Sequence, residues 1–430
     1  MVDRKKIKLP ADPSRVILRY LYLGSNNRII NTINRVLNLT EGKVENLYED
    51  IVNRFYGRHR NFESALYENY KRVEKFVSKE FSLSELRKLL IGAYFSCEYS
   101  IESAALFNPS MVPHPDQSGL NKGEMRFIMS LRATGEGHIS SVEFRSGVMD
   151  ANNNIMLDEI TKYASMPVKR EENVKTGIEN ADELTWEANY NISFSGNEPV
   201  SERVIFPFSR TEKNGIEDVR LVKFYEDDGS FKYYGTFTAY DGTRITSQMI
   251  QTDDFVNFQI RSLHGSKAKD KGMALFPQKI NGKYTIISRL DGENLYFMQS
   301  DNIFRWENAE LFRAPVHDWE FVQIGNSGSP IKTEKGWILL THSVGPLRRY
   351  VISALLLDIE DPKKIIGYLD TPLLEPDEID REGYVPNVVY SCGGLVHNDE
   401  LIIPYAMSDS VSSFAGIKLS KLFQKFIPVR

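Results

Sequence analysis

The chain has 430 residues, of which 41% are hydrophobic and 26% are charged, a balance typical of folded globular proteins rather than disordered ones. Its length suits two or three domains of roughly 150 residues, or one closed β architecture with an appendage. The formal net charge of −5 argues against a protein that binds nucleic acid, because that function needs a basic surface.

The numbers and spacing of cysteine and histidine residues limit the disulfide bonds and metal sites that the chain can form. Cys97 and Cys392 are far apart in sequence, so we expect neither a disulfide framework nor a multi-cysteine zinc site. The seven histidines lack HxxxH or HExxH spacing, and we expect no metal site. Residues 1–15 lack the apolar segment of a signal peptide, and no apolar run approaches a membrane span. A cytoplasmic protein without a membrane partner is predicted.

Helical periodicity is confined to about the first hundred residues. Apolar side chains there recur at helical spacing, as at Val44 and Leu47, and predict three or four helices. Ser82 and Glu85 are predicted to form a capping box before the last of these helices. We expect residues 1–104 to form an α-helical N-terminal extension that packs on the main domain or mediates a homo-oligomer.

The rest of the chain, residues 105–430, predicts strands almost throughout. After a break rich in proline at residues 107–115, short apolar runs alternate with turn signals. The clearest predicted strands are residues 125–131, 140–144, 221–225, 233–239, 284–288, 337–341 and 350–357.

A weak internal repeat indicates how these strands are arranged. The segment Gln251–Phe258 recurs as Gln299–Trp306, 48 residues later. A period near 50 residues built of short strands is typical of propeller blades. In each copy the Asp that follows the strand is expected to close a turn through its side chain, and the aromatic residue to pack between neighbouring sheets. We predict an all-β catalytic domain, a five-bladed β-propeller.

Charged residues near strand starts are the candidates for chemistry, because the inner strands of a propeller surround one central pocket. In Gly215–Arg220 two acids precede an arginine, which can orient a carboxylate. Basic residues around 269–289, and small residues at 325–330 that allow close approach of a ligand, suggest an anion or sugar site. Surface ion pairs and structural residues explain the same pattern, so it fits a carbohydrate enzyme or a binding scaffold equally well.

Together these stretches resemble glycoside hydrolase family 130, the mannoside phosphorylases and mannosidases with a five-bladed propeller, over residues 107–419. Residues 215–220 resemble the family motif G-x-E-D-P-R, with Val219 in place of the usual proline. Asn108, in Phe-Asn-Pro, and Arg132 look like the first-blade sugar-binding segment. Similar later segments are residues 274–277, 330–337, 356–362 and 385–389.

The resemblance implies inverting cleavage of β-mannosides by inorganic phosphate, giving α-mannose 1-phosphate, with β-1,2-linked manno-oligosaccharides as the favoured substrates. Asp218 would be the general acid, passing its proton to the glycosidic oxygen through a mannose hydroxyl. Burial or the neighbouring Glu217 should then raise the pKa of Asp218. Three further residues are implied to contact mannose: Asn108, Arg132 and Asp409.

Phosphate would be a co-substrate, and no other cofactor is expected. The resemblance places five residues at or near its binding positions: Lys271, Arg289, Lys332, His342 and Tyr350. Two departures from the usual phosphorylase pattern bear on this site. Gly272 stands where asparagine is frequent, and residues 326–330 replace a proline-rich segment. We favour phosphorolysis by a modest margin.

Two alternatives stay open. An inverting β-1,2-mannosidase would use water activated by a carboxylate base, for which Glu293, and then Asp291, are the candidates. A non-catalytic sugar-binding propeller would use the helical segment for docking. A furanosidase on a similar propeller is less favoured, because its three carboxylates do not match these motifs.

Overall fold

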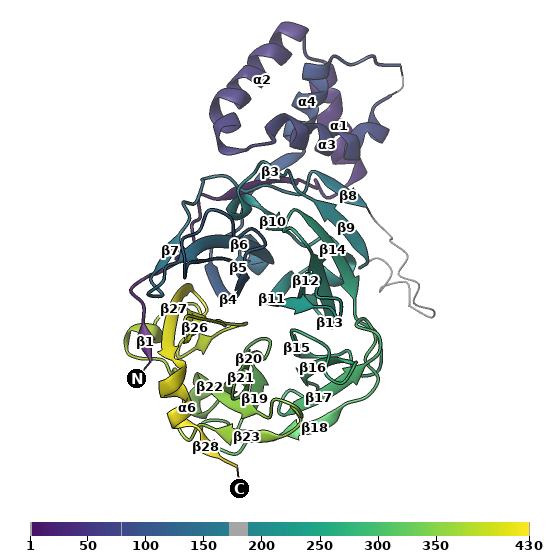
Figure 1. Cartoon of the computed structure of the whole chain (residues 1–430). Helices are drawn as coiled ribbons and strands as arrows, with labels where there is room; N and C mark the ends of the chain where they lie inside the picture. Colours follow the sequence, from purple (N-terminus) through teal and green to yellow (C-terminus); the bar gives the residue numbers. More distant parts are fainter. Residues whose placement is uncertain (1, 79, 172–187, 430) are drawn as a thin grey trace. The chain divides into compact units, whose positions relative to one another are not determined.

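The computed structural model of the chain describes residues 2–78, 80–171 and 188–429. The chain divides into two compact units, a smaller one of residues 12–103 and 161–166 and a larger one of residues 1–11, 104–160 and 167–430. The larger unit is built mainly of strands, whereas the smaller unit holds the helices α1 to α4 (Figure 1). The prediction of a mainly β chain with a helical segment near its start is confirmed.

Four α-helices and one strand pair form the smaller unit: α1 (Asn26–Leu37), α2 (Glu41–Phe55), α3 (Phe62–Val73), α4 (Glu85–Tyr94), β2 (Val16–Tyr20) and β3 (Ser96–Ser100). The number of helices agrees with the prediction, but the strand pair was not predicted. The predicted capping box at Ser82 is wrong. Helix α4 is capped by Ser84 instead, whose hydroxyl accepts a hydrogen bond from the Arg87 backbone N–H at 3.3 Å.

The strands of the larger unit fall into five successive groups. The first two share one eleven-stranded sheet but are joined by a single parallel pairing, Gly215 with Ser140. The first group contains β4 (Ala105–Pro113), β5 (Met125–Thr134), β6 (Ser140–Met149), β7 (Ile155–Leu157) and β10 (Val204–Ile205). The second contains β8 (Lys169–Glu171), β9 (Tyr190–Ser193), β11 (Gly215–Tyr225), β12 (Phe231–Tyr240), β13 (Ile245–Thr252) and β14 (Asn257–Ser262).

The remaining three groups are separate sheets. The third contains β15 (Lys271–Leu275), β16 (Tyr284–Arg289), β17 (Leu295–Ser300) and β18 (Glu310–Arg313). The fourth contains β19 (Gln323–Asn326), β20 (Ile331–Thr333), β21 (Gly336–Val344), β22 (Tyr350–Leu357), β23 (Ile365–Tyr368) and β28 (Ile427–Pro428). The fifth contains β1 (Asp3–Arg4), β24 (Val389–Tyr390), β25 (Leu395–His397), β26 (Glu400–Met407) and β27 (Val411–Lys418), followed by helix α6 (Leu419–Lys425).

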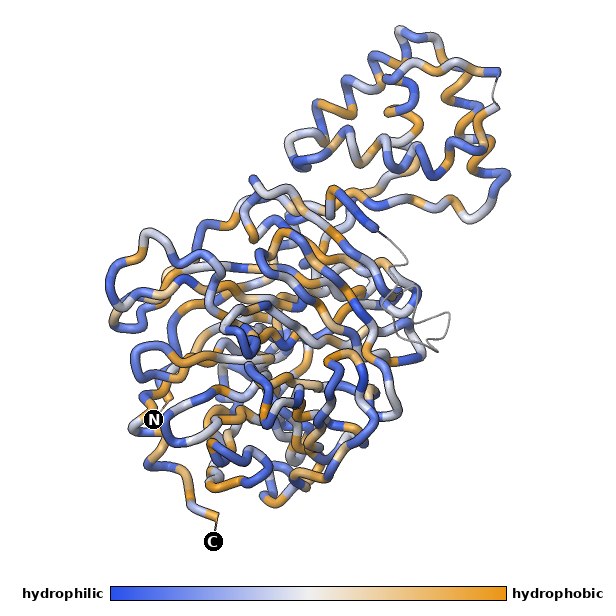
Figure 2. The backbone as a smooth tube through the Cα atoms, turned by 45° about the vertical axis from the view of Figure 1, so that its right-hand side comes forward, coloured by the Kyte–Doolittle hydropathy of each residue, from blue (hydrophilic) through white to orange (hydrophobic). Residues whose placement is uncertain are grey.

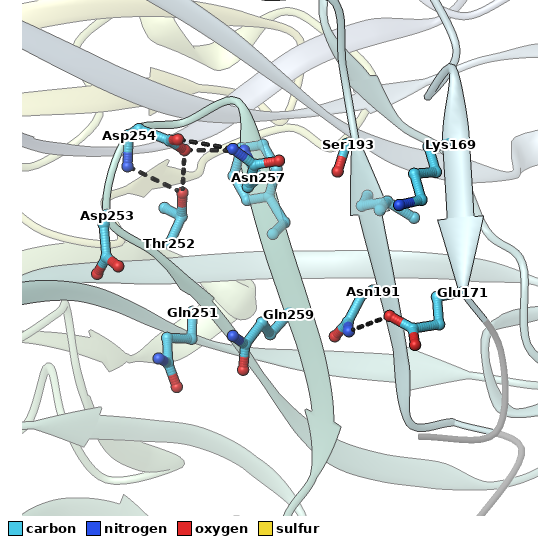
Figure 3. Close-up of a pocket in the computed structure, with 12 residues that line it drawn as sticks. Lys169, Glu171, Asn191, Ser193, Gln251, Thr252, Asp253, Asp254, Asn257 and Gln259 are labelled. Atoms are coloured by element: carbon cyan, nitrogen blue, oxygen red, sulfur yellow. Dashed lines mark hydrogen bonds between the residues drawn. The ribbon is translucent and has the colours of Figure 1, made fainter. Parts of the chain in front are cut away.

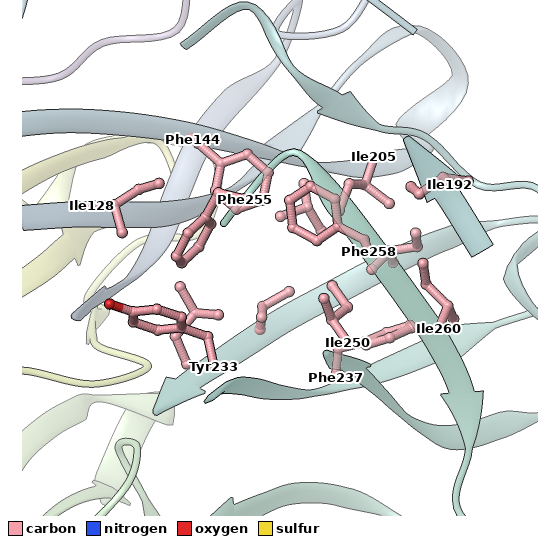
Figure 4. Close-up of a cluster of buried hydrophobic side chains, with 14 of the residues drawn as sticks. Ile128, Phe144, Ile192, Ile205, Tyr233, Phe237, Ile250, Phe255, Phe258 and Ile260 are labelled. Carbon is pink, nitrogen blue, oxygen red and sulfur yellow. The ribbon is translucent and has the colours of Figure 1, made fainter. Parts of the chain in front are cut away.

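Five hydrophobic clusters join these groups, one at each successive interface. Figure 4 shows part of the cluster between the first two groups, where Phe144 stacks on Phe258 at 5.7 Å between ring centroids. Equivalent clusters lie between the second and third, third and fourth, and fourth and fifth groups, and the last lies between the fifth and the first. The groups therefore follow one another around a common centre (Figure 1). Figure 2 shows hydrophobic and hydrophilic residues interspersed along the chain, and the hydrophobic ones provide the side chains of these cores.

The internal repeat falls at equivalent places, because each copy begins in the last two residues of a strand, β13 in the second group and β17 in the third. Asp254 accepts hydrogen bonds from two backbone N–H groups of its turn, as expected. In the second copy the residue that closes the turn is Asn302, which accepts from Phe304, rather than an Asp. The aromatic residues that end the two copies, Phe258 and Trp306, are buried between strand groups, which confirms the expected packing.

Candidate active site

Asp218 lies in a bulge of strand β11. The pairing of β11 with β12 slips between Glu217 and Arg220, and Asp218 has a φ of +55° there. Such a bulge bends the strand and re-aims the side chain, and a left-handed non-glycine residue is typical of functional sites. One Asp218 carboxylate oxygen accepts hydrogen bonds from Asn108 Nδ2 at 2.8 Å and from the Arg132 guanidinium at 3.4 Å. The structure thus brings the predicted acid together with two predicted sugar contacts.

Asn108 lies in a second bulge, in β4. The pairing of β4 with β5 slips between Phe107 and Ser110, and Asn108 has a φ of +50°. Its Nδ2 is used by Asp218, whereas its Oδ1 is buried and has no hydrogen-bond partner. A buried acceptor left without a donor costs about 1–3 kcal/mol, so this oxygen is suited to receive a ligand hydroxyl.

Glu217 lies between two cations. Its carboxylate accepts hydrogen bonds from Arg132 at 2.9 Å and from Lys271 Nζ at 2.6 Å. Arg132 also donates to Ser140 Oγ at 2.9 Å and lies over the Phe107 ring at 5.0 Å. The guanidinium is therefore fixed by contacts from β4, β6 and β11, which restricts its movement toward or away from Asp218.

The predicted rise in the pKa of Asp218 is wrong for the unliganded site. Burial does raise this pKa, as expected, but the charges of Arg132, Arg220 and Lys271 and the hydrogen bond from Asn108 outweigh it. The pKa of the Asp218 carboxyl is held below its usual value, and the group is ionised at neutral pH.

Arg220 connects three groups of strands at the centre of the larger unit. The side chain is buried and donates to Asn326 Oδ1 at 3.0 Å, to the main-chain carbonyl of Asp218 at 2.9 Å and to Tyr390 Oη at 2.7 Å. Arg220 therefore fixes the backbone that carries Asp218, in place of the carboxylate pairing that the sequence suggested.

Two of the predicted phosphate contacts face each other across a strand pair. Lys271 on β15 pairs with Arg289 on β16. The Arg289 Nε is buried and donates no hydrogen bond, and an oxygen of Asp270 lies 4.0 Å away. A buried guanidinium N–H that lacks an acceptor is suited to an incoming anion, because charge-assisted hydrogen bonds to oxygen are strong.

His342 and Tyr350 lie against each other at the ends of two paired strands. Their rings stack with centroids 6.2 Å apart, and the Tyr390 ring lies 4.7 Å from the His342 ring. Tyr390 in turn accepts the hydrogen bond from Arg220, so this aromatic group continues the network that starts at Asp218.

The His342 imidazole is neutral. Burial, and then the charges of Arg289 and Arg220, hold its pKa well below the usual value. The main-chain carbonyl of Asn326 lies 2.9 Å from Nδ1 and can only accept, so Nδ1 carries the hydrogen. Nε2 is then an acceptor, which faces the Gln323 amide at 3.3 Å.

Gly325 leaves room for the His342 ring. A Cβ atom at this position would lie 2.3 Å from His342 Cε1, and the ring is held by Asn326 and by two tyrosines. We expect Gly325→Ala to lower the free energy of unfolding by about 1–3 kcal/mol, as overpacked cores do. Chemical denaturation checks this, with Gly196→Ala as control because no atom lies within 4 Å of a Cβ there. Equal stability of both variants would contradict the packing role.

Lys332 lies apart from the other predicted phosphate contacts. It is exposed, donates to Gln278 at 3.3 Å and lies over the Trp337 ring at 5.4 Å. Lys332 pairs with Trp337 near the start of β21, whereas His342 is near its end, about 16 Å farther at the usual rise of a strand. The structure therefore does not bring Lys332 to this cluster.

Asp409 lines a cavity of about 260 Å³ beside Arg132. Burial, and then the negative charge of Asp218, raise the pKa of Asp409 to about 6, although Arg132 and Arg348 act in the opposite direction. The cavity, called the sugar cavity below, is lined by Phe107, Arg132, Thr134, Gly137, His138, Asn214, Glu217, Tyr240, Tyr384 and Asp409.

The two candidate bases for a hydrolase lie in a tight turn before β17. Asp291 accepts hydrogen bonds from the backbone N–H groups of Glu293 and Asn294 and from the side chains of Asn294 and Tyr296. These bonds outweigh partial burial and hold the pKa of Asp291 far below its usual value. Glu293 is exposed. Asp291 closes its own turn, and no contact links either carboxylate to Asp218.

A second hollow of about 300 Å³ lies on the face of strands β8, β9, β13 and β14 (Figure 3). Its floor is a row of polar side chains that are neighbours across the strands, such as Gln251, Gln259, Asn191 and Glu171. Asn191 donates to Glu171 at 2.9 Å (Figure 3). This arrangement is typical of a solvated sheet face, and it contains none of the predicted site residues.

Several residues of the site were missed by sequence reasoning. Asn326 and Tyr390 bind Arg220, and His138 and Tyr384 line the sugar cavity. The only available signal was weak: Asn326 lies in the small-residue segment that departs from the usual pattern, and the others carry no charge pattern.

Other features of the described residues can be stated briefly. In the described part of the chain, no three His, Cys, Asp or Glu side chains are grouped so that they could hold a metal ion. Cys392 is a buried free thiol. Among residues 2–78, 80–171 and 188–429, no helix is long and apolar enough to span a membrane.

Comparison with known proteins agrees with these motifs. A family model described as β-1,4-mannooligosaccharide phosphorylase matches residues 178–426. The 1,2-β-oligomannan phosphorylase of Thermoanaerobacter sp. (strain X514) is 33% identical over 218 residues, which cover 49% of this chain and 71% of that protein. The β-1,2-mannobiose phosphorylase of Listeria innocua is 27% identical over 228 residues, covering 51% of this chain and 62% of the relative.

Solved structures show a similar fold. The β-1,2-mannobiose phosphorylase of Listeria innocua in complex with β-1,2-mannobiose superposes with a TM-score of 0.51 at 22% identity, covering 75% of this chain and 92% of that one. The family match spans more than half of the chain, and the Thermoanaerobacter relative supports it over most of its own length. The chain belongs to glycoside hydrolase family 130.

Proposed function

We propose that this chain is an inverting phosphorylase that cleaves β-mannosides with inorganic phosphate and releases α-mannose 1-phosphate. The observation that carries the proposal is the buried Arg289 Nε, which donates no hydrogen bond and lies across a strand pair from Lys271. Lys271 in turn donates to Glu217 beside Asp218. The names of the two relatives, a 1,2-β-oligomannan phosphorylase and a β-1,2-mannobiose phosphorylase, favour β-1,2-linked substrates. Family membership supports the same activity.

The proposed scaffold is a five-bladed β-propeller made of the five strand groups. The five hydrophobic clusters between successive groups, with the last between the fifth and the first, support this arrangement. In a propeller the inner strands converge on one centre. This accounts for the contact of Asn108 on β4 with Asp218 on β11, and for that of Tyr390 on β24 with Arg220 on β11.

In the proposed reaction a phosphate oxygen attacks the anomeric carbon while the bond from that carbon to the glycosidic oxygen breaks. The leaving oxygen takes a proton, which Asp218 supplies through a mannose hydroxyl. Inversion requires phosphate and leaving group to lie on opposite faces of the sugar. The phosphate would be held by Lys271, Arg289 and the His342–Tyr350 pair. Because His342 is neutral, it would contribute only by its position or by a hydrogen bond with a phosphate hydroxyl.

An ionised Asp218 fits this scheme if phosphate arrives before the proton is needed. The negative charge of a bound phosphate offsets the charge of Lys271, which is one of the cations that lower the pKa of Asp218. The pKa of Asp218 then rises. The co-substrate would in this way favour protonation of the acid that its own attack requires.

Asn108, Arg132 and Asp409 are the proposed mannose contacts, and phosphate is the only co-substrate proposed. The free Asn108 Oδ1 and the position of Asp409 in the sugar cavity support this assignment. The exposed position of Lys332 weighs against its role in phosphate binding. A cytoplasmic location and a homo-oligomer formed through the helical segment stay predictions.

The first test is incubation with β-1,2- and β-1,4-mannobiose, with and without phosphate, followed by assay of mannose 1-phosphate and free mannose. We expect mannose 1-phosphate only when phosphate is present, in an amount equal to the bonds cleaved, and faster turnover of the β-1,2 substrate. Phosphate-independent release of mannose would instead indicate the mannosidase, and Glu293→Gln should then abolish activity.

A further inference from the structure

The described lining of the sugar cavity contains two chemically different sets of residues. The charged set is Arg132, Glu217 and Asp409, of which Arg132 and Glu217 belong to the network around Asp218. The uncharged set has no carboxylate and no permanent cation, and it consists of His138, Tyr384, Asn214 and Tyr240. These four residues lie in loops and at strand ends.

An unusual backbone conformation at the tip of a hairpin accompanies the contact between His138 and Tyr384. Gly137 and His138 at the tip of the β5–β6 hairpin have φ values of +67° and +60°. A left-handed histidine is strained by about 1–2 kcal/mol, and such strain persists where other contacts hold it. Here the His138 Nδ1 shares a hydrogen bond of 2.8 Å with the Tyr384 hydroxyl, 246 positions later in the chain.

Tyr384 is anchored beside Asp409 by its neighbours in the chain. The backbone N–H of Val385 donates to the carbonyl of Ser408 at 2.9 Å, and Gly383 lies so close to Ser408 that a Cβ would be 2.6 Å from its side chain. The Tyr384 ring nevertheless remains 48% exposed. A fixed aromatic ring that is half open to solvent beside a polar cavity offers a stacking face to a sugar ring, whose C–H faces are apolar.

The proposed inverting reaction indicates which sugar the uncharged set receives, because phosphate and leaving group lie on opposite faces of the reacting sugar. The proposed phosphate contacts are absent from the lining of the sugar cavity: Lys271, Arg289, His342 and Tyr350. Arg132 lines the cavity and contacts Asp218, the proposed proton source for the leaving oxygen. Both observations favour the leaving group as the occupant.

We propose that His138 and Tyr384 form the leaving-group subsite and determine which acceptor sugars the enzyme uses. This inference rests on the proposed phosphorolysis. In the reverse direction the subsite binds the acceptor sugar, whose hydroxyl oxygen attacks the anomeric carbon of α-mannose 1-phosphate as phosphate leaves. The hydroxyl proton returns to Asp218. The Tyr384 ring stacks on the acceptor, and His138 fixes the ring.

The test is synthesis from α-mannose 1-phosphate and mannose by Tyr384→Ala, His138→Ala and Tyr384→Phe. Tyr384→Ala should raise KM for mannose about tenfold, which corresponds to about 1.4 kcal/mol, and should leave KM for α-mannose 1-phosphate within twofold. His138→Ala and Tyr384→Phe, which free the ring but keep it, should give smaller increases. Tyr225→Ala is the matched control, since Tyr225 is also 48% exposed but lies outside the cavity.

Unchanged KM for mannose in Tyr384→Ala overturns the inference, and so does an equal rise in KM for α-mannose 1-phosphate, which would place the ring against the donor sugar. Both results leave the proposed phosphorolysis intact. If the wild-type chain forms no mannoside from α-mannose 1-phosphate, the proposed function fails and the inference fails with it. A shift in acceptor preference from mannose to glucose or N-acetylglucosamine in Tyr384→Ala supports a role in specificity.

Discussion

Asp218→Asn is expected to lower kcat for phosphorolysis of β-1,2-mannobiose by about 10²–10⁴-fold, the usual contribution of a general acid. Asparagine keeps the shape of the side chain and an oxygen that can accept from Asn108 and Arg132, so KM for both substrates should change little. Steady-state kinetics at saturating phosphate measure the effect. Asp291→Asn is the control, because Asp291 closes a turn away from this network.

A second readout separates a role in proton transfer from a structural one. Since the pKa of Asp218 is lowered in the empty site and should rise when phosphate binds, the wild-type protein should take up a proton on binding. Calorimetric titration with phosphate in two buffers of different ionisation enthalpy counts this proton. The Asp218→Asn variant should take up fewer, and equal uptake, or kcat within tenfold of wild type, would contradict the assignment.

Arg220→Met is expected to lower the free energy of unfolding by about 3–5 kcal/mol, the cost typical of removing one partner from a buried charged network. Three buried acceptors would lose their donor: the Asp218 carbonyl, Asn326 Oδ1 and Tyr390 Oη. Activity should fall as well, because the backbone of Asp218 is no longer held. Denaturant titration followed by fluorescence measures the loss.

Two companion variants make the Arg220 result specific. Arg305→Met removes an exposed arginine paired with Glu307 and should change stability by less than about 0.5 kcal/mol. Arg220→Lys keeps the charge, but a single ammonium group cannot reproduce the planar fork that serves three acceptors, so we expect only partial recovery. Full recovery by lysine would show that charge alone, rather than the fork, matters here.

Sequence patterns predicted those parts of the fold that depend on residues close together in the chain. The seven predicted strand segments all fall within observed strands, because short apolar runs bounded by turn signals are a local property of the sequence. The repeat also predicted where its turns lie, since the side chains that close them bind backbone only two or three residues away. The predicted Asp closes the first turn as Asp254, whereas Asn302 closes the second.

The electrostatics of Asp218 could not be predicted from local sequence. Burial was foreseen, and its direction is right, but the cations that reverse the shift arrive from elsewhere in the chain. Lys271 lies on β15 and Arg132 on β5, and their distances to Asp218 are set by how the strand groups pack. A sequence motif specifies which residue carries the carboxylate, whereas its pKa depends on tertiary neighbours.

The uncharged residues of the site were not predicted from the sequence, for a related reason. Asn326 accepts from Arg220 and donates to the carbonyl groups of Gly272 and Ile287, yet a single asparagine at the end of a short strand carries no distinctive pattern. Lys332 shows the converse error. Its charge and its place in a motif-like segment suggested a ligand contact. Lys332, however, pairs with the start of β21, and His342 lies near the other end of that strand.

The order in which the chain enters and leaves the two units determines how the protein can be shortened. Strand β1 pairs with β27, and Arg4 forms ion pairs with Asp377 and Asp380, so the first residues belong to the fifth strand group. The helical unit is thus spliced into the chain as an insertion, and its entry and exit are adjacent, since the Asp12 backbone N–H donates to Glu102 at 2.9 Å. A truncation before residue 104 would therefore remove part of the strand unit, whereas excising residues 12–103 with a short linker would keep residues 1–11. The excision would also remove Arg15, which binds the carbonyl groups of Thr161 and Tyr163.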